Sequence, residues 1–149
     1  MDYVRRILDG ELDDLFGQVP AIAIDGPKAV GKTTTGEQHV NGLLKLDSKA
    51  RREAVQADPQ SLLRLARPLL IDEWQKVPAV WDVVRRAVDE DPAGGQFLLT
   101  GSASPAPGAT AHSGAGRIGR LRMRPMTLSE RGIGQPTVSL GALLTGRPG

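Results

Sequence analysis

The chain has 149 residues, of which 40% are apolar and 24% are charged, and it contains no cysteine. This composition fits one globular domain that buries roughly two thirds of its unfolded surface, and it excludes collagen-like, intrinsically disordered and disulfide-stapled chains. No apolar stretch approaches the ~18–20 residues that cross a bilayer, and the acidic start of the chain is unlike a signal peptide. We therefore expect a cytoplasmic protein with no membrane contact.

The net charge of +2 is unevenly distributed along the chain. Residues 117–149 carry six basic groups against Glu130 alone, whereas the preceding residues carry 13 basic and 16 acidic groups. A basic end occurs in proteins with an anionic partner, although a solvated basic edge is the commoner explanation. Only five residues are aromatic, which is too few to supply stacking platforms for single-stranded nucleic acid.

Helix-like and strand-like segments alternate along the chain. Apolar residues at helical spacing predict a helix within residues 1–17. Four short apolar runs have the length of buried strands, and they lie at 21–24, 43–46, 69–71 and 97–99. Helical patterns follow at 32–41, 48–56, 60–66 and 80–89. This alternation predicts an α/β three-layer sandwich around a mainly parallel five-stranded sheet.

The last third of the chain is less regular. Residues 101–116 are rich in Gly, Ala, Ser and Pro, which is typical of a functional or a disordered loop. Arg120, Arg122 and Arg124 alternate with apolar residues, which predicts a fifth strand with three arginines on one face. Thr127–Glu130 has the spacing of a capping box and predicts a short helix. We expect one domain over 1–149, with a nucleotide-binding core at 21–125 and a basic segment at 126–149.

The segment Gly26–Thr33 matches the phosphate-binding loop (P-loop, Walker A), in which two glycines flank four residues and Lys-Ser/Thr follows. Glycines let backbone N–H groups approach a phosphate, and the helix that starts near Lys32 directs its partial positive charge at the same anion. Lys32 is expected to contact the terminal phosphates, and Thr33 to bind Mg²⁺. The predicted nucleotide-binding residues are Gly26, Pro27, Lys28, Ala29, Val30, Gly31, Lys32, Thr33 and Thr34.

Paired carboxylates follow the apolar run at 69–71 (Walker B). Asp72 ends a parallel strand, so it is expected to lie on the phosphate side of the sheet and to hold Mg²⁺ through water. Glu73 is expected to polarise the attacking water. A strand that ends in Asp-Glu is by itself common, and the functional interpretation depends on the upstream loop.

Small polar residues and arginines supply the remaining candidates. Thr100 and Ser102 follow the run at 97–99 and are positioned to contact the γ-phosphate or the water, although turn chemistry explains them equally well. Arg117 or Arg120 would supply positive charge to the transition state, within the chain or across a subunit boundary. A surface role explains each arginine nearly as well.

Four motifs in this order resemble the AAA+ superfamily of P-loop ATPases, and more narrowly a prokaryotic group whose AAA domain precedes an uncharacterised C-terminal domain. The resemblance covers residues 3–145. It is carried by Gly26–Thr35, Leu70–Pro78, Leu99–Ser102 and His112–Arg117, and residues Met126–Gly132 also resemble that group. It implies ATP as ligand, Mg²⁺ as cofactor, and Arg117 as an arginine finger that acts in trans within a homo-oligomer.

The resemblance also implies a helical lid and a C-terminal domain, and the 149 residues are too few for either. We therefore expect a nucleotide-binding core whose turnover is inefficient, taken from a longer protein or belonging to a truncated relative.

The leading hypothesis is an ATP-binding hydrolase core that uses Mg²⁺ and serves an unknown partner. A P-loop kinase for a small molecule would need an acceptor pocket, whereas the Asp-Glu pair suits water as nucleophile. A GTPase is disfavoured because no Asn-Lys-x-Asp motif is present. A nucleotide-sensing or DNA-binding module with little hydrolysis is the non-enzyme alternative, motivated by the basic end. We prefer an arginine row that faces a neighbouring subunit, because it explains the same charges without DNA.

Overall fold

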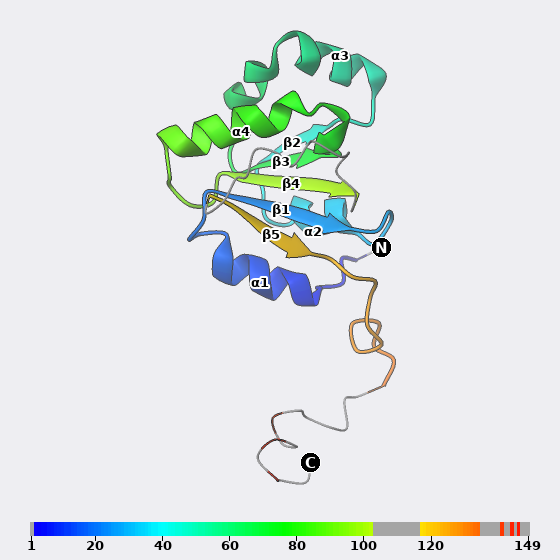
Figure 1. Ribbon diagram of the computed structural model, residues 1–149. Helices are drawn as coiled ribbons and strands as arrows, with labels where there is room; N and C mark the ends of the chain where they lie inside the picture. The colour runs from blue at the N-terminus through cyan, green and yellow to red at the C-terminus, as the bar shows by residue number, and fades with distance from the viewer. Residues whose placement is uncertain (1, 103–116, 135–140, 142–143, 145, 147–149) are drawn as a thin grey trace.

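A computed structural model describes residues 2–102, 117–134, 141, 144 and 146. Its centre is a five-stranded sheet in the order β2-β3-β4-β1-β5, and every strand pair is parallel (Figure 1). The strands are β1 (Ala21–Gly26), β2 (Gly42–Lys45), β3 (Leu69–Asp72), β4 (Phe97–Ser102) and β5 (Ile118–Arg122). The α/β class and the five parallel strands expected from the sequence are confirmed, although β5 ends at Arg122, so that Arg124 lies outside the strand.

Helices cover both faces of the sheet (Figure 1). On one face lie α1 (Ile7–Leu15) and α2 (Lys32–Glu37). On the other lie α3 (Lys49–Ala57), the 3-10 helix η1 (Pro59–Arg64) and α4 (Ala79–Glu90). A second 3-10 turn, η2 (Trp74–Lys76), follows β3. None of the helices in the described ranges is long and apolar enough to cross a bilayer.

The two faces of the sheet carry separate apolar clusters because side chains alternate along each strand. In β1, Ile22 and Ile24 pack with Leu8 and Leu12 of α1. Ala21 and Ala23, which alternate with them, belong to the opposite cluster, which includes the buried valines of α4. β1 is therefore covered on both sides, which explains why its first four residues are all apolar.

Two helices are shorter than their sequence patterns predict. α1 begins only at Ile7, because the backbone of Arg6 is extended, and the side chains of Tyr3 and Arg6 contact Thr35 and Val30 instead. α2 ends at Glu37, where the N–H groups of Gln38 and His39 turn to carbonyls three residues back. Such tighter bonds are usual in the last turn of a helix.

The predicted helix after Thr127 does not form. The capping-box bonds are present, since the Thr127 N–H donates to Glu130 Oε2 (2.7 Å) and the Glu130 N–H donates to Thr127 Oγ1 (3.2 Å). The segment nevertheless closes as a single turn over residues 128–132. Gly132 and Gly134 both have positive φ, and this left-handed backbone ends the turn. Most of the predicted 101–116 loop lies outside the described residues.

Helix α1 contributes to the core through one stripe of side chains. Two substitutions measure how much this stripe contributes to the free energy of unfolding. Leu12 is fully buried and Leu15 is 41% exposed, although both belong to α1. Leu12→Ala should lower the free energy of unfolding by ~2–5 kcal/mol, because it leaves a cavity under the sheet. Leu15→Ala is the matched control and should change it by less than ~0.5 kcal/mol in urea denaturation. Equal effects of the two would contradict the packing of α1.

Candidate functional site

Three strands bring the predicted motifs to one edge of the sheet. β4 pairs with both β3 and β1, so that Asp72 lies beside Thr100 and Gly26 lies beside Ser102. All strands are parallel, and these residues stand at their carboxyl ends, where ligands of open α/β sheets bind. The order of the strands therefore unites motifs that are far apart in sequence.

The loop between β1 and α2 has the backbone that its glycines predict. A Cβ on Gly26 would lie 2.4 Å from the carbonyl oxygen of Met123, so only glycine fits against the segment that follows β5. Gly31 has φ of +101°, a left-handed conformation that side chains disfavour. Helix α2 begins at the next residue. The loop thus wraps tightly and ends on a helix N-terminus.

Lys32 is folded into this loop. Its side-chain Nζ donates to the carbonyl oxygens of Gly26 (2.9 Å) and Pro27 (2.6 Å), and the residue is 6% exposed. An ammonium group has three N–H donors, two of which these carbonyls occupy. The loop therefore holds a buried positive charge at its centre.

Three of the predicted residues meet at one oxygen atom. The hydroxyl groups of Thr33 and Thr100 both donate to Oδ1 of Asp72, at 2.8 and 2.6 Å. Thr100 is fully buried and Asp72 is 9% exposed. Hydroxyl and carboxylate oxygens are ligands that Mg²⁺ accepts. Among the described residues no group of three or more His, Cys, Asp or Glu could hold a metal on its own.

Glu73 is held by Gln75, a residue to which no sequence motif assigns a role. The side-chain amide of Gln75 donates to Glu73 Oε2 (2.7 Å) and to the Ser102 hydroxyl (3.2 Å). Glu73 itself has φ of +59°, a left-handed conformation that costs ~1–3 kcal/mol and concentrates at functional sites. In the sequence, the signal for the role of Gln75 is its position two residues after the carboxylate. In the structure, its side chain lies beneath the end of β4.

The two candidate arginines each pair with a carboxylate of their own chain. Arg117 precedes β5, whose first residue pairs with the start of β1, whereas the loop follows the end of β1. Its guanidinium forms an ion pair with Asp89 of α4. Arg120 pairs with Asp25 (3.3 Å) and lies over the ring of Trp81, 5.3 Å from its centre. Arg117 therefore lies near the start of β1, whereas the loop follows the end of that strand.

A cavity of about 720 Å³ adjoins the loop, and the sequence analysis did not predict it. Three segments form its walls: the extended N-terminus, the loop with α2, and the stretch after β5. Its lining includes Tyr3, Val4, Arg6, Val30, Gly31, Thr34, Thr35, Pro125, Met126 and Arg131. Val4 and Ile7 share the helical spacing of the apolar residues within 1–17, but both side chains are exposed.

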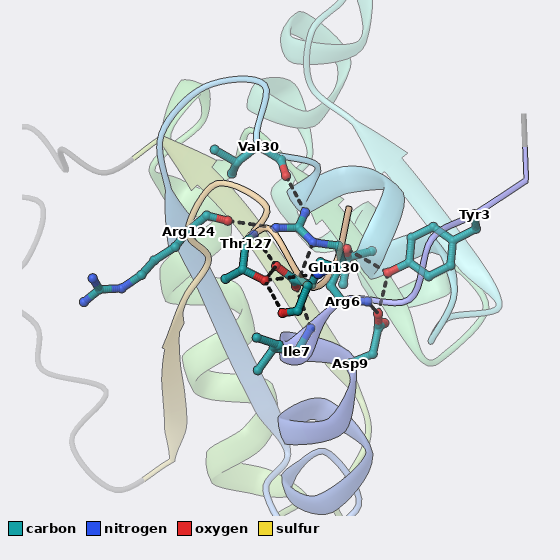
Figure 2. A network of polar contacts seen from close by, with 10 residues as sticks. Tyr3, Arg6, Ile7, Asp9, Val30, Arg124, Thr127 and Glu130 are labelled. Carbon is teal, nitrogen blue, oxygen red and sulfur yellow. Dashed lines mark hydrogen bonds and ion pairs between the residues drawn. The ribbon is translucent and has the colours of Figure 1, made fainter. Parts of the chain in front are cut away.

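One cavity wall is fixed by a network around Asp9 (Figure 2). Its Oδ2 accepts hydrogen bonds from the Tyr3 hydroxyl and the Arg6 N–H, both at 2.6 Å, while His39 contacts Oδ1 at 2.8 Å. The Tyr3 oxygen also lies 3.0 Å from Thr35 Oγ1. Burial and the hydrogen bond to Asp9 raise the pKa of Tyr3 to about 12. Burial alone would raise the pKa of Asp9, but the bonds from Tyr3, Arg6 and His39 outweigh it and lower that pKa.

One protein family matches most of the chain, and curated proteins and a solved structure are also similar to it. The family described as "AAA domain" matches residues 18–131. Uncharacterized proteins of Mycobacterium bovis and Mycobacterium tuberculosis are each 30% identical over 141 residues, a match that covers 86% of this chain and 30% of each relative. The chain thus spans about 30% of the length of these relatives. A point mutant of RuvB from Thermotoga maritima is similar in structure, at 22% identity over 93% of this chain and 49% of that one, with a TM-score of 0.41.

The tyrosine in the cavity wall offers a direct test, because it is the single tyrosine of the chain. Its phenolate absorbance should titrate with a midpoint near pH 12 in the folded protein and near 10 after unfolding. The pKa is raised on folding, so the contribution of Tyr3 to stability is complete below pH 10 and is lost as the pH rises through about 12.

Asp9→Asn should lower the pH midpoint of the Tyr3 titration in the folded protein, because the carboxylate that accepts the hydrogen bond of the phenol is gone. Tyr3→Phe is the control and should abolish the transition. A folded midpoint near 10 in the unsubstituted protein would contradict the network.

Proposed function

The chain belongs to the AAA domain family of AAA+ P-loop ATPases, and from this premise we propose that it binds ATP with Mg²⁺ at the β1–α2 loop and hydrolyses it. The observation that carries the proposal is the meeting of Thr33, Asp72 and Thr100 at one oxygen atom beside the buried Lys32. The phosphate loop therefore lies next to Thr33 and Asp72, whose side-chain oxygens can bind a cation. Water as nucleophile fits the carboxylate of Glu73.

The loop residues would bind the triphosphate. Backbone N–H groups of residues 26 and 28–34 would surround the β- and γ-phosphates, since Pro27 has no N–H to donate, and Lys32 would exchange its loop carbonyls for phosphate oxygens. Thr33 would bind Mg²⁺ directly and Asp72 would bind it through water. When bound, Mg²⁺ supplies neutralisation of the charge that develops on the β- and γ-phosphate oxygens.

Glu73 would act on the water. Its carboxylate orients the molecule and accepts its proton while the water oxygen bonds to the γ-phosphorus and the bond to the ADP oxygen breaks. Gln75 holds the carboxylate in place through its 2.7 Å hydrogen bond. Thr100 and Ser102 lie next to these groups at the end of β4. In the proposed complex, their hydroxyls would contact the γ-phosphate.

The cavity of about 720 Å³ would take the adenosine part of ATP. It adjoins Gly31 and Thr34 of the loop, and Val4 and Met126 provide apolar surface for a base. A single ATP molecule would therefore place its base in this cavity and its triphosphate on the loop. Most small-molecule sites have this combination of apolar walls and few polar groups.

We extend the proposal to a cytoplasmic homo-oligomer in which Arg117 reaches the ATP of a neighbouring chain. Arg117 would have to leave Asp89 of α4 to do so. Positive charge supplied in this way accelerates hydrolysis by ~10³–10⁵ where it operates. We also propose that ATP hydrolysis drives a change in a partner.

The first test is the loop lysine. Lys32→Ala should weaken ATP binding by ~10–100-fold, the loss expected for one charge-assisted phosphate contact. Calorimetry with ATP and Mg²⁺ measures this effect. Lys49→Ala removes an exposed lysine on α3 and should bind ATP as the unsubstituted protein does. Equal affinities of all three proteins would refute the proposed site.

The second test separates binding from turnover. Glu73→Gln should bind ATP normally and release phosphate ~10²–10⁴-fold more slowly, because the amide cannot accept the proton of the water. Glu53→Gln alters an exposed glutamate of α3 and should leave the rate unchanged.

Phosphate release by Glu73→Gln at the ordinary rate would contradict this role. Binding without release in the unsubstituted protein would favour the nucleotide-sensing alternative, and release only with an added small-molecule acceptor would favour the kinase.

A further inference from the structure

The guanidinium of Arg6 joins three segments of the chain (Figure 2). Its Nη1 donates to the carbonyl oxygen of Val30 in the phosphate loop (2.8 Å), and Nη2 donates to that of Arg124 (2.9 Å). Nε donates to Oε1 of Glu130 at 3.1 Å. The side chain is 6% exposed. A planar guanidinium can serve three acceptors at once, which a lysine ammonium cannot do in this forked geometry.

Glu130 is saturated with hydrogen bonds in the same place. Its Oε1 also accepts from the Ile7 N–H of α1 (2.8 Å), and its Oε2 accepts from the N–H and the hydroxyl of Thr127 (2.7 and 3.0 Å). Burial by itself would raise the pKa of Glu130, but these bonds and the one from Arg6 lower it to about 2. The carboxylate is thus ionised at neutral pH opposite a permanent cation.

The Arg6–Glu130 pair touches the phosphate loop in a way that bears on its N–H groups. The Val30 carbonyl and the Gly31 N–H belong to one planar peptide unit, so a bond that fixes the carbonyl also fixes the direction of the N–H. A Cβ on Gly31 would lie 3.3 Å from Arg6 Nη1, which shows how closely the guanidinium is seated on the loop. Arg6 therefore sets the orientation of a group expected to face a phosphate.

The same pair holds one wall of the cavity. Residues 124–131 after β5 contribute Pro125, Met126 and Arg131 to the lining. The bonds of Arg6 to the Arg124 carbonyl and to Glu130 connect this segment to the loop and to α1. In Figure 2, Arg6 links the Val30 carbonyl of the loop to the Arg124 carbonyl and Glu130 of the wall.

We propose that Arg6 and Glu130 are positioning residues for the nucleotide: Arg6 orients the phosphate loop, and the Arg6–Glu130 pair holds the 124–131 wall against the base. The inference rests on the proposed function, because it takes ATP as the ligand. The two side chains act through the Val30 peptide and through the wall, and no contact with ATP is assigned to them.

Two ligands separate the two effects. ATP uses the loop and the cavity, whereas inorganic tripolyphosphate uses the loop alone, and both are titrated with Mg²⁺ by calorimetry. Arg6→Lys should weaken both ligands by about tenfold, because the loop peptide and the wall are released together. Glu130→Gln keeps the bond from Arg6 to Val30, so it should weaken ATP by about threefold to tenfold and leave tripolyphosphate within about twofold.

Matched controls come from neighbouring exposed charges. Arg5→Ala removes an arginine that is 69% exposed and adjacent in sequence, and Glu90→Gln changes an exposed glutamate at the end of α4. Both should bind the two ligands as the unsubstituted protein does. Thermal unfolding checks that each variant is folded, and if one fails to fold the other still decides.

Each outcome is decisive. Folded Arg6→Lys and Glu130→Gln variants that bind ATP normally would overturn the inference. An equal loss of both ligands in Glu130→Gln would also overturn it, because a general loss of structure does not distinguish ATP from tripolyphosphate. If Lys32→Ala binds ATP normally, the proposed function itself fails. If Lys32→Ala loses ATP while the Arg6 and Glu130 variants retain it, only this inference fails.

Discussion

One carboxylate oxygen organises the candidate site: Oδ1 of Asp72 accepts hydrogen bonds from both Thr33 and Thr100. Thr33 is in the first turn of α2, Asp72 ends β3 and Thr100 is in β4, so this atom fixes three elements relative to one another. Because β4 lies between β3 and β1, the carboxylate faces the same edge as the loop that follows β1. A phosphate on the loop and a cation beside Asp72 would therefore be neighbours.

Local patterns predicted the sheet and the loop well, because their physics is local. The run Ala21–Ile24 is apolar at every position since β1 is covered on both faces, and Gly26 and Gly31 are required by close approach and by positive φ. The convergence of Asp72 with the loop also followed from sequence, because parallel strands present their carboxyl ends at one edge.

The cavity and the Arg6–Glu130 pair could not be predicted in this way. Arg6 and Glu130 are 124 positions apart, and no periodicity connects them. The capping-box pattern correctly indicated the bonds between Thr127 and Glu130. It was wrong about the helix, because a carboxylate that also binds Arg6 and the Ile7 N–H serves a tertiary contact and the following glycines end the turn.

The basic end has a different meaning in three dimensions. Arg117 and Arg120 pair with Asp89 and Asp25, and Arg120 also lies over Trp81, so part of the excess charge joins β5 to α4 and β1. Charge counted along the sequence therefore overstates what is available to an anionic partner. An arginine that acts in trans must first exchange an internal carboxylate for a phosphate.

A crystal structure with a non-hydrolysable ATP analogue and Mg²⁺ tests the central claim most directly. The triphosphate should lie on residues 26–34, with Lys32 Nζ moved from the carbonyls of Gly26 and Pro27 to the phosphate oxygens. Mg²⁺ should lie beside Thr33 and Asp72, and the adenine should lie in the cavity next to Tyr3. A triphosphate bound elsewhere, or a loop that stays empty at saturating analogue, would contradict the assignment of this site.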